Sequence, residues 1–496
     1  MMRQVVVILL LIGLVPGKIE AENEPLDLIS AIKIALENNR DLQYKAHYDL
    51  KIATSNYQAA LADYRLQSNL TTSASRTGQK TFDSSKTVKK SKGTDYDSSL
   101  SWNWKLPTPL GSEFNPFARI DLARTDSEPT EDATTSDKKY TLDLSTGFEW
   151  KQPLWPSQVR AGHASLIQAK ANYDIARLSY RQVREELILN AITSYYQLIS
   201  QENQVKLARE ELKLTRDLLA LSQARLEADQ IARLDLMQVK VQASSDEAEL
   251  IGAENLFKNS KLVFCRLLDL PINSKILIPE ETLVEPTIFS SLAGLSKEAA
   301  FEESLKDRID LKGQQINIDL AGLSLDISES ENKPALTFAG NHKWKNDKKK
   351  LEDIDREMDR EWEVSAVLNF PLLDGGLTRE NVKAAKLTLK KAKYDYEELL
   401  RSIRDEIDQL FEDIQAEKRR LDILNLNLRL AEESSKITKL KYQQGMETAN
   451  EVLRSQILLF QMKNSINEAM IALFINKAKL LKTMGRLEIE YESKIN

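Results

Sequence analysis

The chain has 496 residues, and its 69 basic and 75 acidic side chains give a formal net charge of −6, so no basic excess indicates a nucleic-acid-binding protein. A single cysteine, Cys265, excludes internal disulfides, and three histidines far apart in sequence exclude Cys/His zinc motifs. With only 16 Gly and 13 Pro, the composition predicts long helices with few turns. No pattern indicates a catalytic centre, a metal site or a cofactor, so we do not expect an enzyme.

The N-terminus is typical of a signal peptide. Arg3 precedes an apolar run from Val5 to Val15, and small residues follow at Gly17 and Ala21. The run is too short to span a bilayer, so we expect residues 1–21 to be removed and the protein to be exported. Cleavage near Gly17 and an uncleaved anchor remain alternatives. No later segment has about 18 uninterrupted apolar residues, so no transmembrane helix is expected.

Helical periodicity follows in residues 26–62 and in two very long stretches, 157–268 and 376–486, each interrupted once. Apolar and small residues there alternate three- and four-residue steps, as in Val205, Ala208, Leu212, Thr215, Leu219, Ser222 and Leu226. Such a sustained 3.5-residue period is typical of helices packed along a seam. By itself this pattern would also fit a coiled-coil rod.

Between about 66 and 153, and again between 334 and 371, the period changes to two. The clearest row is Tyr140, Leu142, Leu144, Thr146, Phe148 and Trp150, alternating with polar residues or glycine. Rows of about ten residues, apolar on one face and polar on the other, are typical of outer-membrane β-strands, and all six tryptophans lie in or beside them. Half-buried strands of a soluble sheet would alternate in the same way. Four rows fall in the first half of the chain and two in the second, and His342 stands on an apolar face where an interfacial position is expected.

The chain also repeats itself. Gln152-Pro153-Leu154 ends the first strand region and Phe370-Pro371-Leu372 ends the second, and each is followed by a helix, a break and a second helix. We therefore divide the chain into a first repeat (22–269), a linker (270–297), a second repeat (298–486) and a C-terminal tail (487–496). Cys265, at the end of a helix, is expected to be a buried small apolar residue rather than a reactive thiol.

Several motifs together give a family resemblance: Leu26-Asp27-Leu28, Phe370-Pro371-Leu372-Leu373-Asp374-Gly375-Gly376, Tyr442-Gln443-Gln444-Gly445 and Glu451-Val452-Leu453. In their order and spacing the chain resembles the TolC-like outer-membrane efflux and secretion proteins over nearly its whole length. The resemblance implies a mainly α fold with membrane β: a trimer closing one outer-membrane β-barrel, continued by a long periplasmic α-helical barrel. It also implies that the linker packs outside the helical barrel. The chain departs from the family in having four strand rows in its first half, where the family typically has two.

The resemblance further implies a passive exit duct of a tripartite efflux or type I secretion system, with a gate at its periplasmic end. Expected partners are two further copies of the chain, a periplasmic adaptor (membrane fusion) protein, an inner-membrane pump and outer-membrane lipid, with no nucleic acid. A trimeric structural or adhesin-like coiled-coil surface protein is the alternative. Whether the cargo is a drug, a metal or a polypeptide is left open.

The two helix breaks are the candidate functional sites. Ala228, Asp229 and Gln230, and Gln444, Gly445 and Met446, are expected at hairpin tips that meet the adaptor, with Gly445 as a left-handed cap and Asp229 as its less typical counterpart. By resemblance, Asp235 and Tyr442 match a pair that links the inner and outer helices in the closed state, and Glu451 matches a pore-facing aspartate. Arg454 aligns with a second such aspartate and Glu447 with a gating arginine, so the gate charges are partly exchanged. Alternatively, these are solvated helix-surface residues.

Overall fold

The computed structural model describes residues 26–81, 91–108, 111–127, 137–154, 163–271, 287–331, 333–348, 359–370 and 372–495. The expected signal peptide, Trp155, Pro371 and residues 272–286 of the linker lie outside these ranges.

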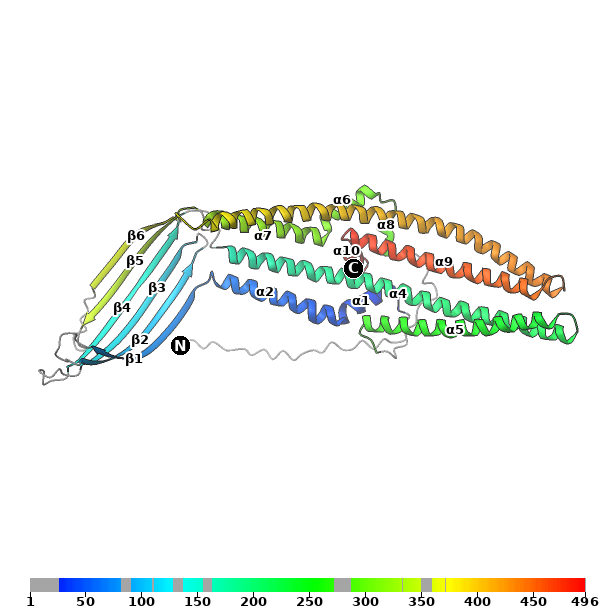
Figure 1. Ribbon diagram of the computed structural model, residues 1–496, viewed down its shortest axis with the longest axis horizontal. Helices are drawn as coiled ribbons and strands as arrows, with labels where there is room; N and C mark the ends of the chain where they lie inside the picture. The colour runs from blue at the N-terminus through cyan, green and yellow to red at the C-terminus, as the bar shows by residue number, and fades with distance from the viewer. Residues whose placement is uncertain are drawn as a thin grey trace. The chain divides into compact units, whose positions relative to one another are not determined.

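The first half begins with helix α1 (Leu28–Asn38), which ends at its C-cap Asn39 and is followed by a π-helical turn, η1 (Asp41–Ala46), that leads into α2 (His47–Ala62) (Figure 1). Four strands follow, β1 (Gln67–Thr81), β2 (Ser91–Pro107), β3 (Glu113–Ser127) and β4 (Asp137–Pro153). The long hairpin is α4 (Ala164–Glu227) and α5 (Arg233–Leu267). At about 1.5 Å per residue, the 64 residues of α4 extend for about 96 Å.

The second half repeats this order after a 3₁₀ turn, η2 (Thr287–Leu292). It contains α6 (Lys297–Asp307), α7 (Ile309–Glu331), β5 (Ala335–Lys348), β6 (Asp359–Asn369), and the hairpin of α8 (Leu377–Gln443) and α9 (Ala449–Thr483). The segment expected as a C-terminal tail forms α10 (Leu487–Ile495), in which Leu487 and Tyr491 are buried.

The chain forms two compact units that do not coincide with the two sequence repeats. One unit takes the chain up to Ala46, Arg181–Ile309 and everything from Arg401 onward, and the other takes His47–Tyr180 and Asp310–Leu400. Both repeats therefore contribute to both units, because α4 and α8 each pass from one unit into the other.

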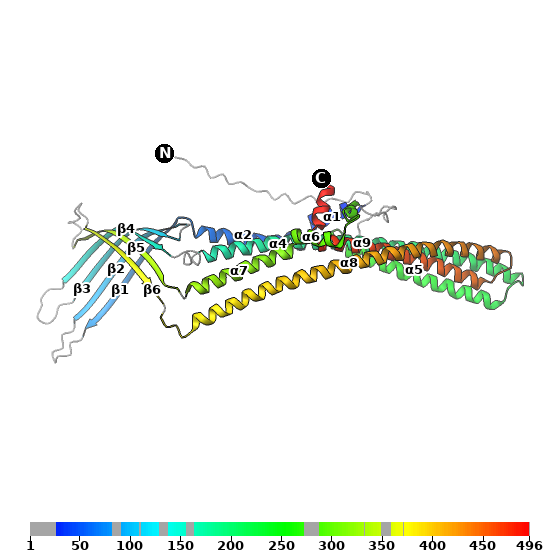
Figure 2. The same cartoon turned by 90° about the horizontal axis from the view of Figure 1, so that it is seen from above.

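The second unit contains one antiparallel sheet in which the six described strands lie side by side in chain order, β1 to β6 (Figure 1). In the view from above, the same strands overlap (Figure 2). Its two faces differ in chemistry. One cross-strand row on the polar face runs through Thr71, Ser101, Arg119, Ser145, Lys345 and Asp359. On the opposite face the neighbouring row includes Thr72, Leu100, Ile120 and Leu144. This division is the one expected for a membrane barrel with a polar interior.

A second row marks the loop end of the apolar face. Arg76, Tyr96, Arg124 and Tyr140 stand directly opposite one another on β1 to β4. The Arg76 guanidinium lies 5.3 Å from the Tyr96 ring centroid, and that of Arg124 lies 5.4 and 5.6 Å from the rings of Tyr96 and Tyr140. Aromatic rings with cationic neighbours at the end of an apolar face are typical of the girdle at a membrane interface.

Strands β4 and β5 join the two repeats across an unusually close contact at Gly147. A Cβ added there would lie 2.1 Å from the carbonyl oxygen of His342 and 3.0 Å from the Cα of Lys343. Only glycine fits this approach, because the obstructing atoms are backbone. His342 lies on the apolar face, stacked at 6.0 Å on Phe148.

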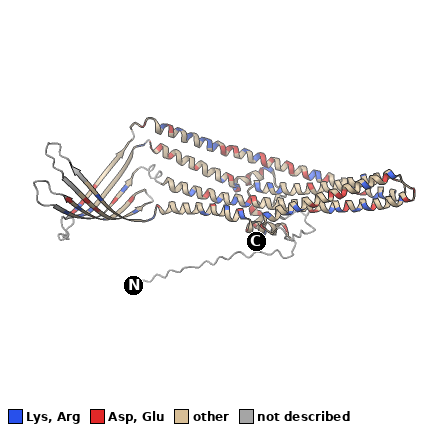
Figure 3. Ribbon diagram, turned by 60° about the horizontal axis from the view of Figure 1, so that its bottom comes forward, with Lys and Arg blue, Asp and Glu red and all other residues tan. Residues whose placement is uncertain are grey.

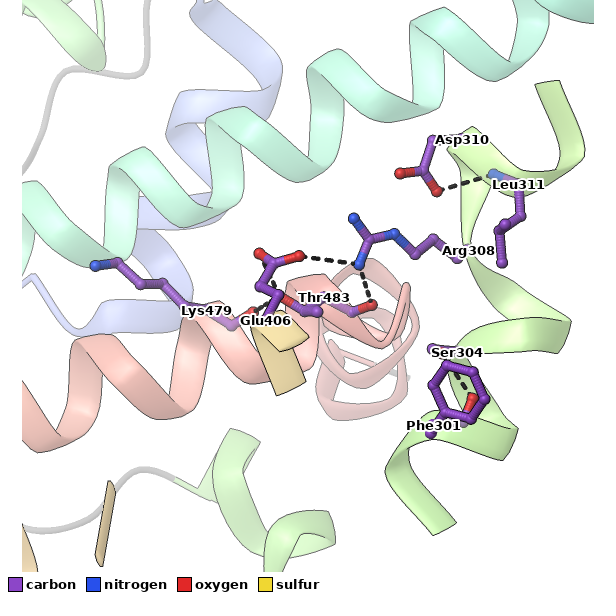
Figure 4. A network of polar contacts seen from close by, with 8 residues as sticks. All are labelled: Phe301, Ser304, Arg308, Asp310, Leu311, Glu406, Lys479 and Thr483. Atoms are coloured by element: carbon purple, nitrogen blue, oxygen red, sulfur yellow. Dashed lines mark hydrogen bonds and ion pairs between the residues drawn. The ribbon is translucent and has the colours of Figure 1, made fainter. Parts of the chain in front are cut away.

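In the first unit, the same kind of contact, which we call a joint, anchors the end of each long hairpin: a side chain at the C-cap of a short helix donates a hydrogen bond to a carbonyl at the end of the hairpin. The Asn39 amide donates to the carbonyl of Leu267 (3.2 Å), and the Arg308 guanidinium donates to the carbonyl of Thr483 (3.0 Å). Asn39 and Arg308 are the C-caps of α1 and α6, and Leu267 and Thr483 end α5 and α9. The second joint is stronger because Arg308 also pairs with Glu406 at 3.2 Å, and the Thr483 hydroxyl donates to the same carboxylate (Figure 4).

Aromatic residues fill the core of this unit. The rings of Tyr196 and Phe289 contact that of Phe474 at centroid distances of 5.1 and 6.2 Å, and the Tyr195 hydroxyl donates to the carbonyl of Leu26. Cys265 is fully buried, as predicted, and this burial raises the pKa of its thiol against the opposing influence of Lys261. Basic and acidic residues are interspersed along the long helices (Figure 3).

Candidate functional site

The two hairpin turns of the first unit have the same backbone geometry. Asp229 (φ 56°) and Gly445 (φ 79°) are both left-handed, as predicted. In each turn the backbone N–H of the third residue past the helix donates back to a carbonyl of the last helical turn, from Gln230 to Arg225 (2.8 Å) and from Met446 to Lys441 (2.9 Å). This is the Schellman arrangement, which satisfies carbonyls at the helix end.

Both tips are exposed. All six tip residues named from the sequence have exposed side chains or, for Gly445, an exposed backbone: Ala228, Asp229, Gln230, Gln444, Gly445 and Met446. Large apolar side chains are exposed beside them, with Leu234, Met237 and Met446 at 64%, 57% and 65% of their full accessibility. Such side chains on mainly polar helices provide a surface that a protein partner can bury.

A cluster that we call the tip core lies beneath the turns and holds the two hairpins together. It consists of Leu218 from α4, Val239 from α5, Tyr442 from α8, and Ala449, Val452 and Leu453 from α9. Because each of the four helices contributes to it, separating the hairpins would expose this cluster to water.

Tyr442 is the polar member of the tip core. Only 1% of it is exposed, and a hydrogen bond of 2.8 Å joins its hydroxyl to that of Ser222 on α4. The Arg225 guanidinium lies 4.3 Å from its ring centroid and donates to the carbonyl of Gln443 (2.9 Å). Two hydrogen bonds and one cation–π contact therefore join α4 to the end of α8.

The hydrogen bond expected between Asp235 and Tyr442 is absent from the protomer. Asp235 is half-buried, and its carboxylate makes no hydrogen bond or ion pair with the described residues. The reason is the placement of Tyr442, whose hydroxyl is enclosed in the tip core and takes Ser222 as its partner. Ser222 belongs to the seam of α4. A polar residue at a seam position is the sequence signal that could have identified Ser222 as the partner of Tyr442.

The remaining gate candidates lie around the start of α9. Glu451 and Arg454 form an ion pair of 3.2 Å one helical turn apart, with side chains 46% and 69% exposed. The Thr448 hydroxyl caps the helix by accepting the N–H of Glu451 (3.3 Å). Glu447 is half-buried just before this cap. Pairing of Glu451 with Arg454 between protomers stays a prediction.

Further from the tips, acidic residues gather between α4 and α5. Burial, together with Asp246 and Glu249, raises the pKa of Glu211 to about 7. Asp246 is only 3% exposed and accepts a hydrogen bond of 2.7 Å from Gln242.

In the described part of the chain, no three His, Cys, Asp or Glu side chains are placed to hold a metal ion. Within the same ranges, no helix has the length and apolarity needed to cross a membrane.

Comparison with known proteins agrees with this architecture. The sequence profile of the family described as "Outer membrane efflux protein" matches residues 31–263 and 300–486. The outer membrane protein TolC of Vibrio cholerae is 21% identical over 376 residues, which cover 76% of this chain and 82% of that protein. The alkaline protease secretion protein AprF of Pseudomonas aeruginosa is 20% identical over 340 residues, 67% of each chain.

The crystal structure of the outer membrane protein VceC from Vibrio cholerae superposes with a TM-score of 0.67 at 16% identity, covering 92% of this chain and 96% of that one. The predicted fold class, a TolC-like channel that combines an outer-membrane β-barrel with a periplasmic helical barrel, is thereby confirmed, as is the predicted outer-membrane location. With both halves matched by the profile, the chain belongs to the outer membrane efflux protein family.

Proposed function

We propose that three copies of this chain form the exit duct of a tripartite efflux or type I secretion system. The duct passively conducts substrates delivered by an inner-membrane pump through a periplasmic adaptor. The observation that carries the proposal is the pair of matching exposed tips held over one tip core. A rigid rod has no need of two exposed turns joined by a buried polar contact, whereas a conduit that opens at its periplasmic end needs a joint there.

We propose that the Ser222–Tyr442 hydrogen bond and the Arg225–Gln443 contact hold the hairpins of α4/α5 and α8/α9 together in the closed state. A net value of about 1 kcal/mol for the hydroxyl pair, present three times in the trimer, amounts to about 3 kcal/mol. That is enough to change an open population by about a hundredfold if the three joints open together. Asp235, Glu447, Glu451 and Arg454 then line the constriction and set its ion preference.

Single-channel conductance in planar bilayers tests this gate. Ser222→Ala and Tyr442→Phe each remove the bond and are expected to raise the open probability, with no further gain in the double variant. Adding Asp235→Ala to Tyr442→Phe tests the predicted contribution of the carboxylate, and Glu451→Ala is expected to change ion selectivity. Tyr394→Phe, at an exposed tyrosine of α8, is the matched control. Unchanged gating in the Ser222 and Tyr442 variants, with trimers intact, would exclude this joint as the gate.

Docking at the tips has its own test. Gly445→Trp places a bulky side chain on a left-handed exposed turn and is expected to abolish export and adaptor crosslinking. Normal export with normal crosslinking would show that the adaptor binds elsewhere on the channel.

A further inference from the structure

The described sheet has two unpaired edges. β1 pairs only with β2, and β6 pairs only with β5. Side chains 68–78 of β1 are exposed, and all those of β6 are exposed except Ser365, which is half-buried. Free backbone N–H and C=O groups cannot remain in a bilayer, so both edges must find partners.

We infer that β6 of each protomer pairs with β1 of the next, so that three chains close an 18-stranded barrel instead of the 12-stranded one implied by two strands per repeat. This inference rests on the trimeric duct proposed above. Each protomer contributes an even number of strands, so β1 runs away from the helices and β6 returns to them. The junction between β6 and the next protomer's β1 is therefore antiparallel, like every other pair in the sheet.

The stagger of the strands supports closure. In the cross-strand row from Thr71 to Asp359, Thr71 is four residues from the helix-side end of β1, whereas Asp359 is ten residues from that of β6. The ends therefore slip by six residues over five strand-to-strand steps, which is about 20 Å along the strands for about 24 Å across them. The resulting tilt of about 40° is the tilt of closed outer-membrane barrels, about 35–45°.

The same stagger restricts the register at the new junction. Side chains alternate between faces, so the slip per protomer must be an even number of residues, and six or eight are the even values nearest the observed trend. Ser365 of one protomer then stands opposite Thr71 or Ser73 of the next, on the polar face. On the apolar face the large side chains of β6, Trp362, Val364 and Leu368, lie beside small ones of β1 such as Ala74, a combination that packs well across strands.

Closure with 18 strands makes the outer-membrane passage wide. With strands about 4.8 Å apart and tilted by about 40°, the backbone diameter is about 36 Å, against about 24 Å for 12 strands. The cross-section is then roughly twice as large, so the barrel does not limit passage and selection falls to the periplasmic end.

Cysteine crosslinking tests the junction. In a Cys265→Ala background, Ser365→Cys is combined with Thr71→Cys or Ser73→Cys and treated with a bismaleimide that spans about 8 Å, since directly opposed and diagonal neighbours lie within this reach. Covalent dimers and trimers are expected. The control Ser365→Cys with Asp121→Cys is expected to give none, because β3 lies three strand spacings, about 14 Å, from β6 in either direction.

Electron microscopy of the wild-type trimer in lipid nanodiscs gives the second measurement. Crosslinked trimers together with a barrel about 36 Å wide support the inference. Intact trimers that crosslink neither Ser365→Cys with Thr71→Cys nor Ser365→Cys with Ser73→Cys would overturn the inference. Crosslinked trimers with a barrel only about 24 Å wide would also overturn it, because two strands of each protomer would then lie outside the barrel wall. Loss of conductance in a trimer that still crosslinks would count against the proposed duct and leave the barrel unaffected.

Discussion

Replacing Glu185 with glutamine should make the channel more resistant to unfolding at alkaline pH. Glu185 lies on α4, is only 5% exposed, and its Oε1 has no hydrogen-bond partner among the described residues. The neighbouring carboxylate of Glu488 forms the ion pairs with the nearby guanidinium groups, with Arg181 at 3.4 Å and with Arg184 at 2.7 Å. Burial first, and then repulsion from Glu488, raise the pKa of Glu185 from 4.5 to about 7.

The direction of the effect follows from linkage. Between pH 4.5 and 7 the folded chain holds a proton on Glu185 that the unfolded chain has released, so folding stability falls as the pH rises through this window. A pKa raised to about 7 corresponds to about 3 kcal/mol lost above pH 7 and nothing lost below pH 4.5. Glu185→Gln removes the ionisation and should recover up to that amount at pH 8.5.

The assay is circular dichroism at 222 nm during heating of the detergent-solubilised channel at a fixed scan rate. At pH 8.5 the variant should unfold roughly 5 °C above the wild type, and at pH 4 the two should coincide. Glu186→Gln is the matched control, because Glu186 is 52% exposed and paired with Lys482, and an exposed pair contributes at most about 1 kcal/mol. A Glu185 variant that unfolds at or below the wild-type temperature at pH 8.5 would refute the reasoning.

Three further outcomes are expected. Gly485→Ala should lower the unfolding temperature by several degrees, because Gly485 has φ 71° and an added Cβ would lie 2.8 Å from the Asp307 backbone. Gly252→Ala, in the middle of α5 where an added Cβ would contact nothing, should raise the unfolding temperature slightly. Equal shifts in the two variants would contradict the packing argument. Asp229→Gly should slow amide exchange at the first tip and Gly445→Ala should accelerate it at the second, each by about 1 kcal/mol of local opening, since only glycine adopts positive φ without strain. Cys265 should resist a bulky maleimide in the folded channel and react in urea, and rapid labelling of folded protein would disagree with its burial.

Local chemistry determined a large part of this protein. The change of period from about 3.5 to two identifies every described strand, because side chains alternate faces in a strand whatever it pairs with. The interruptions of the helical period likewise predicted the two helix breaks, and a glycine at position 445 predicted a left-handed conformation there. Six strand rows in the sequence became one sheet of six strands. The seam on α4 also predicted buried positions such as Val205, Ala208 and Leu212.

Only the tertiary structure decided which distant residues meet. The partner of Tyr442 is Ser222, 220 residues away, and not Asp235, because the packing of four helices determines where the hydroxyl points. The joints at Asn39 and Arg308 and the close approach at Gly147 likewise depend on backbone atoms far away in the chain. The strand stagger that sets the tilt of the sheet depends on hydrogen-bond register, which side-chain alternation restricts only to steps of two residues. Sequence periodicity shows which face of an element is buried, but packing alone decides what lies against that face.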